Sequence, residues 1–212
     1  NQDTTPITVD QMIYHARAVV RACHHCLVVC DMPFGSYQVS REDGIRNAIR
    51  IIKETGAGAV KMEGGKEIAD TVKGIVDAGI PVIGHLGLTP QSIHKFGGYG
   101  LRAKEDTEAE KLIEDALALD AAGVSGITLE KVPAALANKV TAMVKAATIG
   151  IGAGNGTDGQ VLVYADALGM TSGFKPKFLR HFANVNKCMT EGVMEYIRCV
   201  KSESFPSEAE SY

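Results

Sequence analysis

Short apolar runs alternate with longer amphipathic stretches along most of the chain. Short apolar runs separated by helical stretches are typical of buried parallel strands in βα units. We therefore predict a strand at each run. The predicted strands comprise residues 26–30, 59–60, 81–84, 125–129, 148–151 and 160–164.

The amphipathic stretches predict the intervening helices. Thr8 begins the first one, and Gln11 follows at the spacing of a capping box. The predicted helices comprise about residues 8–22, 40–56, 66–78, 107–122 and 133–145. This alternation predicts an α/β fold built on a parallel sheet.

The number of strands leaves the architecture open. A closed (β/α)₈ barrel needs eight strands and typically about 250 residues, and this pattern provides only six βα units in 212 residues. The chain is therefore either an open, doubly wound sheet or a (β/α)₈ barrel without its first units. The spacing of the strands is compatible with both.

Composition adds several expectations. A 45% hydrophobic content favours one well-packed domain over residues 1–212. The net charge of −3 gives no reason to expect a nucleic acid or an anionic membrane as partner. Five cysteines in an α/β chain favour reduced thiols and a cytoplasmic location. Because the chain begins at Asn1 and not at methionine, a mitochondrial targeting segment is also compatible with it.

Polar residues follow the first two predicted strands. Asp31 ends one strand, and Lys61 and Glu63 end the next. Residues two apart in a strand project to the same face, so Lys61 and Glu63 should point together. Two carboxylates at a strand-end rim suit Mg²⁺, which keeps water and takes ligands from an anionic substrate. The alternative is a simple Lys–Glu pair beside an Asp that caps a turn.

Two further strand ends carry candidate catalytic groups. His85 lies between glycines, which leave room for a ligand; the alternative is a packed histidine bonded to a backbone carbonyl. Glu130 follows an apolar strand, and a partly desolvated carboxylate is suited to general-base work. Its alternative is an acid at a helix N-terminus.

Two other motifs are weaker. The glycine-rich residues 150–159 lack a P-loop lysine and lead into a strand, so we interpret them as a structural loop. Residues 23–26, Cys-His-His-Cys, resemble half of a zinc site, but the sequence has no second pair at a suitable distance.

Five ordered motifs resemble those of the ketopantoate hydroxymethyltransferase family. The resemblance runs from about Asp3 to Tyr212. The motifs comprise residues 29–37, 60–65, 84–92, 129–133 and 149–162.

The resemblance implies a (β/α)₈ TIM barrel of the phosphoenolpyruvate/pyruvate class. In that family two further strands precede the position of Asn1, and one ends in an Asp-Ser pair that supplies a metal ligand and substrate contacts. The family usually has Cys at the position of Lys131 and His at that of Ala165. It also implies a homo-oligomer, a decamer.

The implied reaction moves a hydroxymethyl group from 5,10-methylenetetrahydrofolate to 3-methyl-2-oxobutanoate, giving ketopantoate for pantothenate biosynthesis. Asp31 and Glu63 would bind Mg²⁺ or another divalent cation, and Asp31, Lys61 and His85 would bind substrate. Glu130 would be the catalytic proton acceptor. The alternatives are another metal-dependent 2-oxo acid aldolase or lyase, a Schiff-base enzyme that uses Lys61, and a catalytically impaired assembly subunit.

Overall fold

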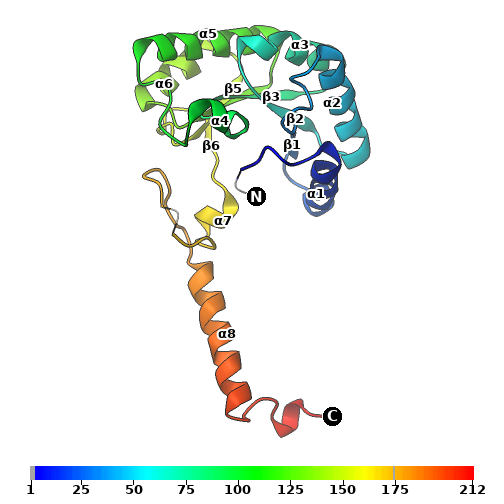
Figure 1. The fold of residues 1–212 in the computed structure, drawn as a ribbon, viewed down its shortest axis with the longest axis vertical. Coiled ribbons are helices and arrows are strands. Elements are labelled where there is room, and N and C mark those ends of the chain that lie inside the picture. Colours follow the sequence, from blue (N-terminus) through cyan, green and yellow to red (C-terminus); the bar gives the residue numbers. More distant parts are fainter. Residues whose placement is uncertain (1–2, 174) are drawn as a thin grey trace. The chain divides into compact units, whose positions relative to one another are not determined.

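The computed structural model describes residues 3–173 and 175–212. The chain comprises two compact units, one that ends at Val161 and one that begins at Leu162. The first unit holds the sheet and its helices, and the second holds the remaining helical segments (Figure 1). The expectation of a single barrel domain over residues 1–212 stays a prediction.

The sheet of the first unit has six strands, and every neighbouring pair is parallel. Their spatial order is β1-β2-β3-β4-β5-β6, the same as their order in the chain. A doubly wound sheet reverses its order at a switch point, whereas a barrel wall adds strands in sequence. The strands are β1 (Val29–Asp31), β2 (Ala59–Glu63), β3 (Val82–Gly87), β4 (Gly126–Glu130), β5 (Ala147–Ile151) and β6 (Gly159–Gln160).

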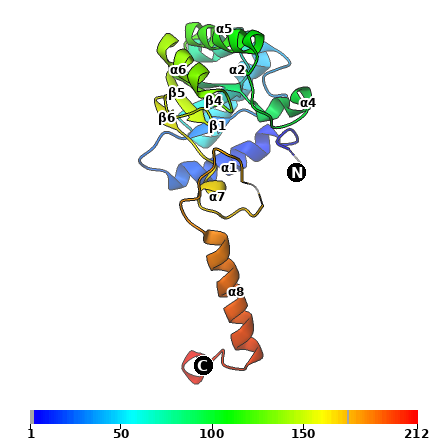
Figure 2. The ribbon, with the colours of Figure 1, turned by 90° about the vertical axis from the view of Figure 1, so that its left-hand side faces the viewer.

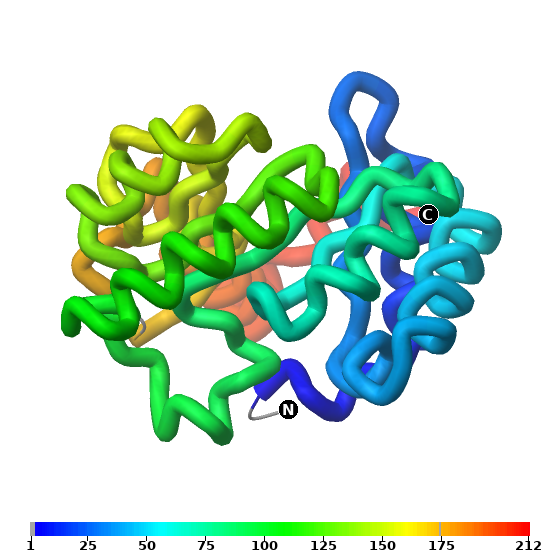
Figure 3. The backbone as a smooth tube through the Cα atoms, turned by 90° about the horizontal axis from the view of Figure 1, so that it is seen from above, coloured from blue at the N-terminus to red at the C-terminus, as the bar shows by residue number. Residues whose placement is uncertain are grey.

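Consecutive helices pack against one another along the outer side of the strands (Figures 1 and 3). Thr8 caps the first helix through a complete capping box with Gln11, as predicted. Gly56 and Gly123 follow the ends of two helices in the left-handed conformation that glycine adopts without steric cost. The main helices are α1 (Val9–Ala22), α2 (Arg41–Thr55), α3 (Ala69–Asp77), α5 (Asp106–Ala122) and α6 (Ala134–Met143).

Three short helical segments lie between these elements. A 3₁₀ turn, η1 (Lys66–Ile68), precedes α3, so the single helix predicted from residue 66 is in fact two segments. A second 3₁₀ turn, η2 (Pro90–Ser92), leads into the short α4 (Ile93–Phe96). Both turns follow the carboxyl end of a strand, β2 and β3 respectively.

Side chains alternate between the two faces of each strand, and this places the hydrophobic core and the candidate site on opposite faces of the sheet. Val60 and Met62 are fully buried in the hydrophobic core, together with Ile75 of α3 and Leu119 of α5. Positions on the opposite face of these strands carry polar side chains, beginning with Lys61. The hydrophobic core therefore lies between the sheet and the helices and leaves the other face for chemistry.

Two predicted strands are shorter than expected. β1 begins at Val29, and Leu27 before it is 62% exposed, so the strand is shorter than the apolar run 26–30, although Val28 O still accepts a hydrogen bond from Gly58 N over 3.0 Å. β6 ends at Gln160, and Tyr164 begins a short helix, α7 (Tyr164–Ala167), so the prediction of a strand over residues 160–164 was wrong beyond Gln160. Val163 is 56% exposed, and periodicity alone does not distinguish a short exposed apolar run from a strand.

The second unit contains α7, a long helix α8 (Val185–Lys201) and a 3₁₀ turn η3 (Glu208–Glu210). Figure 2 shows α8 as one straight rod, and none of its residues is buried. Within the described residues, no helix has the length and apolar character that crossing a membrane requires.

Candidate active site

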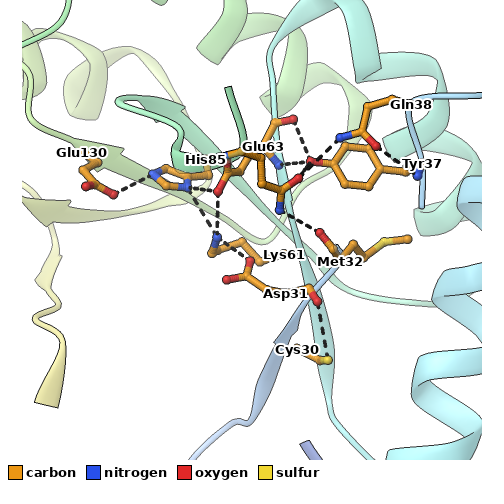
Figure 4. Close-up of polar contacts among 10 residues, drawn as sticks. Cys30, Asp31, Met32, Tyr37, Gln38, Lys61, Glu63, His85 and Glu130 are labelled. Carbon is orange, nitrogen blue, oxygen red and sulfur yellow. Dashed lines mark hydrogen bonds and ion pairs between the residues drawn. The ribbon is translucent and has the colours of Figure 1, made fainter. Parts of the chain in front are cut away.

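The five candidate residues of the sequence analysis come together at the carboxyl ends of the strands (Figure 4). In the parallel register Asp31 lies opposite Lys61, and Glu63 lies opposite His85. Glu130 pairs with Gly87, two residues beyond His85 on the same strand. Side chains at these positions share one face of the sheet, so the register alone brings them together.

Lys61 is the central cation of this cluster. Its ammonium forms an ion pair with Asp31 and lies 3.9 Å from Glu63 Oε1. The same Nζ lies 3.4 Å from His85 Nδ1. The Lys61 side chain is 20% exposed, so it remains within reach of a ligand that enters from solvent.

His85 lies between two carboxylates. Its Nδ1 is 3.5 Å from Glu63 Oε1, and its Nε2 is 3.2 Å from Glu130 Oε2. Burial alone would lower the pKa of His85, but the contacts with Glu130 and Glu63 outweigh it, and the pKa is raised above its ordinary value. The Nε2 contact lacks regular hydrogen-bond geometry, so among the described residues this atom has no hydrogen-bond partner. The buried Nε2 therefore faces the Glu130 carboxylate without a regular hydrogen bond.

The backbone around Glu130 fixes its place at the rim. Leu88 N donates to Glu130 O over 2.8 Å, and Lys131 N donates to Ile151 O over 2.8 Å. Gly87 has φ +87°, and a Cβ there would lie 2.2 Å from Glu130 O. Glycine is therefore required at this position for β3 and β4 to approach as closely as they do.

Two residues that the sequence analysis did not single out hold Glu63 in place. Glu63 N donates to the buried Tyr37 hydroxyl over 3.0 Å, and Gln91 N donates to Glu63 Oε2 over 2.8 Å. The Tyr37 hydroxyl lies 2.9 Å from Gln91 Oε1, and Gln91 Nε2 donates to Met32 O over 2.9 Å. Both lie inside the recognised motifs, Tyr37 in a loop and Gln91 in the short turn η2, where periodicity gives no signal for their contacts.

The cluster carries an excess of negative charge. Asp31, Glu63 and Glu130 face one lysine and one histidine. Buried or partly buried carboxylates are normally paired or bound to a metal. Among the described residues, however, no group of three or more His, Cys, Asp or Glu side chains is arranged to hold a metal ion. The donor set fits a cation such as Mg²⁺, which takes one or two protein carboxylates and draws its other ligands from water and substrate.

Other polar strand-end residues have structural contacts. Asp166 lies on α7, where it accepts a hydrogen bond from the Thr171 hydroxyl. In the glycine-rich loop, Asp158 accepts bonds from the backbone and hydroxyl of Thr148. The Lys131 ammonium donates a hydrogen bond to the Tyr99 carbonyl oxygen.

Solved structures of low sequence identity share the fold. Phosphonopyruvate hydrolase superimposes with a TM-score of 0.55 at 12% identity, over 98% of this chain and 74% of that one. A Burkholderia cenocepacia J2315 protein described as a lyase/mutase gives a TM-score of 0.52 at 14% identity, over 94% and 69%. The predicted α/β barrel class is therefore confirmed, with six strands of the barrel wall in this chain.

Closer relatives share the sequence. The 3-methyl-2-oxobutanoate hydroxymethyltransferase of Flavobacterium johnsoniae is 57% identical over 212 residues, which cover 100% of this chain and 78% of the relative. The enzyme of the same name from Bacteroides fragilis is 56% identical over the same shares, and that from Chlorobium phaeobacteroides is 54% identical over 99% and 77%. The model of the ketopantoate hydroxymethyltransferase family matches residues 1–208. This chain belongs to the ketopantoate hydroxymethyltransferase family.

Proposed function

We propose that this chain transfers a hydroxymethyl group from 5,10-methylenetetrahydrofolate to 3-methyl-2-oxobutanoate and so makes ketopantoate for pantothenate biosynthesis. Membership of the family supports the overall reaction. The observation that carries the chemistry is the placement of Glu130, His85 and Lys61 together at one rim of the sheet.

Glu130 takes the proton from C3 of the oxo acid. Its side chain is 18% exposed, so it is partly shielded from water yet open to a substrate. His85 Nε2 at 3.2 Å orients the Glu130 carboxylate before the substrate arrives. General-base catalysis by a positioned carboxylate contributes about 10²–10⁴-fold to such a step.

Lys61 and His85 bind the oxo acid. The Lys61 ammonium provides the positive charge that the substrate carboxylate and the developing enolate require. His85, whose Nδ1 lies 3.4 Å from the Lys61 ammonium, hydrogen-bonds a substrate oxygen beside it. Asp31 lies beside Lys61 and keeps its side chain in place.

Asp31 and Glu63 would hold Mg²⁺ or another divalent cation, with Glu63 fixed by Tyr37 and Gln91. When bound, the cation supplies Lewis-acid polarisation of the substrate ketone. The remaining chemistry belongs to the protein and the folate. The enolate carbon C3 forms a bond to the one-carbon unit, the bonds from that carbon to the folate nitrogens break, and water supplies the hydroxyl oxygen.

The proposal is tested by product analysis. The protein is incubated with 3-methyl-2-oxobutanoate, 5,10-methylenetetrahydrofolate and Mg²⁺, and ketopantoate is measured by mass spectrometry. Its formation in proportion to protein concentration is the expected result. A folded protein that forms no ketopantoate, but assembles normally, would instead identify a catalytically impaired assembly subunit.

Two other types of reaction can be distinguished from the proposed transfer by experiment. A 2-oxo acid aldolase or lyase would turn over the oxo acid with a different electrophile and would not respond to methylenetetrahydrofolate. A Schiff-base enzyme would use Lys61 as the nucleophile, and borohydride would then label it. We expect no labelling, because Lys61 Nζ is already engaged by Asp31.

The proposal includes a homo-oligomer and a reducing, cytoplasmic setting. One side of α8 carries exposed apolar residues at helical spacing, Met189, Val193, Ile197 and Val200, and such stripes are costly in water. All five cysteines are unpaired, which suits a reducing compartment. A monomer in light scattering at micromolar concentration would contradict the assembly.

A further inference from the structure

A cavity of about 350 Å³ opens beside the cluster, at the carboxyl ends of β2 and β3. Glu63 lines it, and Glu63 also belongs to the active-site cluster. Its other walls include the loop between β1 and α2, the η1 turn, α4, the loop between α4 and α5, and α5 itself. A second cavity lies beside Ser125 and Ala146, at the amino ends of β4 and β5, away from the chemistry. Of these two cavities, the first is therefore the one that can deliver a ligand to the cluster.

The walls of the first cavity suit a flat ring. Phe34 and Phe96 line it, and the Arg102 guanidinium lies 3.9 Å from the centroid of the Phe96 ring. The faces of aromatic rings and of guanidinium groups bind planar heterocycles by stacking. The Arg102 side chain is 25% exposed, so its plane remains partly open.

The charges in the cavity are largely paired, which disfavours a small anion as its occupant. Arg102 Nη2 pairs with Glu108, and Lys111 Nζ donates to Asp115 over 2.6 Å. Arg102 Nε is buried and has no hydrogen-bond partner among the described residues. Lys95, an exposed lysine, also lines the cavity. A cavity with paired charges and one exposed lysine suits a ligand that has a neutral ring with polar edges and an anionic tail.

Hydrogen bonds connect the cavity wall to the turn that carries Glu130, the proposed base. Arg102 N donates to Lys131 O over 2.8 Å, directly after Glu130, and Ala103 N donates to Glu108 Oε2 over 2.7 Å. The loop that carries Arg102 is therefore fastened both to α5 and to the turn that carries Glu130. A ligand held against Arg102 is consequently held in a defined place relative to Glu130.

We propose that this cavity binds the pterin ring of the reduced folate co-substrate, with Phe96 and Arg102 as its stacking wall. The inference rests on the proposed function, which requires a folate beside the enolate. At about 350 Å³ the cavity is at the small end of ligand pockets, so it encloses the ring system only. The aminobenzoyl-glutamate tail extends toward solvent, where Lys95 meets its carboxylates.

The test measures folate binding without catalysis. The affinity of the intact protein for 5-formyltetrahydrofolate, a stable reduced folate, is determined by titration calorimetry for wild type, Phe96→Leu, Arg102→Lys and Phe34→Ala. Stacking of one ring on one flat side chain is worth about 1–3 kcal/mol, which corresponds to about 5- to 150-fold in affinity, so each of the first two changes should weaken binding by at least about 5-fold. Arg46→Lys, at an exposed arginine that also pairs with a carboxylate, is the matched control and should change affinity by less than about 2-fold.

A second readout separates this inference from the proposed function. Exchange of the C3 hydrogen of 3-methyl-2-oxobutanoate into heavy water needs no folate and reports on the Glu130 cluster. Weakened folate binding together with persistent exchange supports the cavity assignment. Unchanged folate affinity in Phe96→Leu, Arg102→Lys and Phe34→Ala overturns it, even where wild type exchanges the hydrogen and makes ketopantoate. A wild type that neither exchanges the hydrogen nor binds the folate overturns both.

Discussion

Tyr37→Phe tests whether the buried hydroxyl of Tyr37 holds Glu63 in place. The Tyr37 hydroxyl accepts from Glu63 N over 3.0 Å, and its proton is shared between Glu63 O at 3.1 Å and Gln91 Oε1 at 2.9 Å. Phenylalanine keeps the ring and leaves no large cavity, so the loss is confined to these bonds. A buried N–H without a partner costs about 1–3 kcal/mol, and a lost donated bond about 0.5–1.5 kcal/mol.

The expected loss of stability is therefore about 1.5–4.5 kcal/mol, a substantial fraction of the roughly 5–15 kcal/mol that stabilises a typical domain. It is measured by urea unfolding at one fixed protein concentration, because the stability of an oligomer depends on concentration. Tyr14→Phe is the control. Tyr14 is 74% exposed and should change stability by less than about 0.5 kcal/mol.

The activity of Tyr37→Phe should fall as well, because Glu63 loses one of the groups that fix it. A Tyr37→Phe protein within about 0.5 kcal/mol of wild type, with an unchanged m-value, would refute this reasoning. It would mean that water or a backbone shift satisfies Glu63 N without cost.

Two other predictions concern the carboxylates. Asp31→Asn should weaken Mg²⁺ binding, measured by calorimetry, by more than the roughly 10–100-fold that loss of an outer-shell partner costs. Asp77→Asn, which changes an exposed ion pair, is the control and should not weaken it. Equal Mg²⁺ affinity in the two variants would remove Asp31 from the metal site. The backbone and hydroxyl of Thr148 hold the pKa of Asp158 below its ordinary value of 3.8. Its contribution to stability is therefore complete above that value and is lost as the pH falls through the lower, folded-state pKa. The stability difference between wild type and Asp158→Asn should shrink in that range, and an NMR midpoint of Asp158 at or above 3.8 would contradict this.

The sequence predicts the composition of the site because a parallel sheet converts order in the chain into proximity. Lys61 and Glu63 share a face through their spacing of two, and each neighbouring strand adds one polar residue at its carboxyl end. Gathering Asp31, His85 and Glu130 beside them requires only that the strands be parallel and in sequence. Helix starts follow from equally local rules, as the capping box of Thr8 illustrates.

The contacts made by loops could not be predicted in this way. Tyr37 reaches Glu63 across 26 positions of the chain and Gln91 across 54, through two loops without periodic pattern. The apolar residues after Gln160 mislead for the opposite reason. Their pattern suits a strand, but β6 ends at Gln160 and the chain turns into α7 instead of extending the sheet.

The central claim is that Glu130 removes the C3 proton of the oxo acid, and Glu130→Gln tests it most directly. Glutamine keeps the shape of the side chain and an oxygen atom near His85 but cannot act as the base. Exchange of the C3 hydrogen into heavy water, measured by NMR without folate, should fall by about 10²–10⁴-fold, while the oxo acid and Mg²⁺ still bind nearly as in wild type. Lys61→Ala should instead weaken oxo acid binding as well as exchange, because it removes a charge partner of the carboxylate. Exchange at the full rate in Glu130→Gln would contradict the account and transfer the role of base to another group.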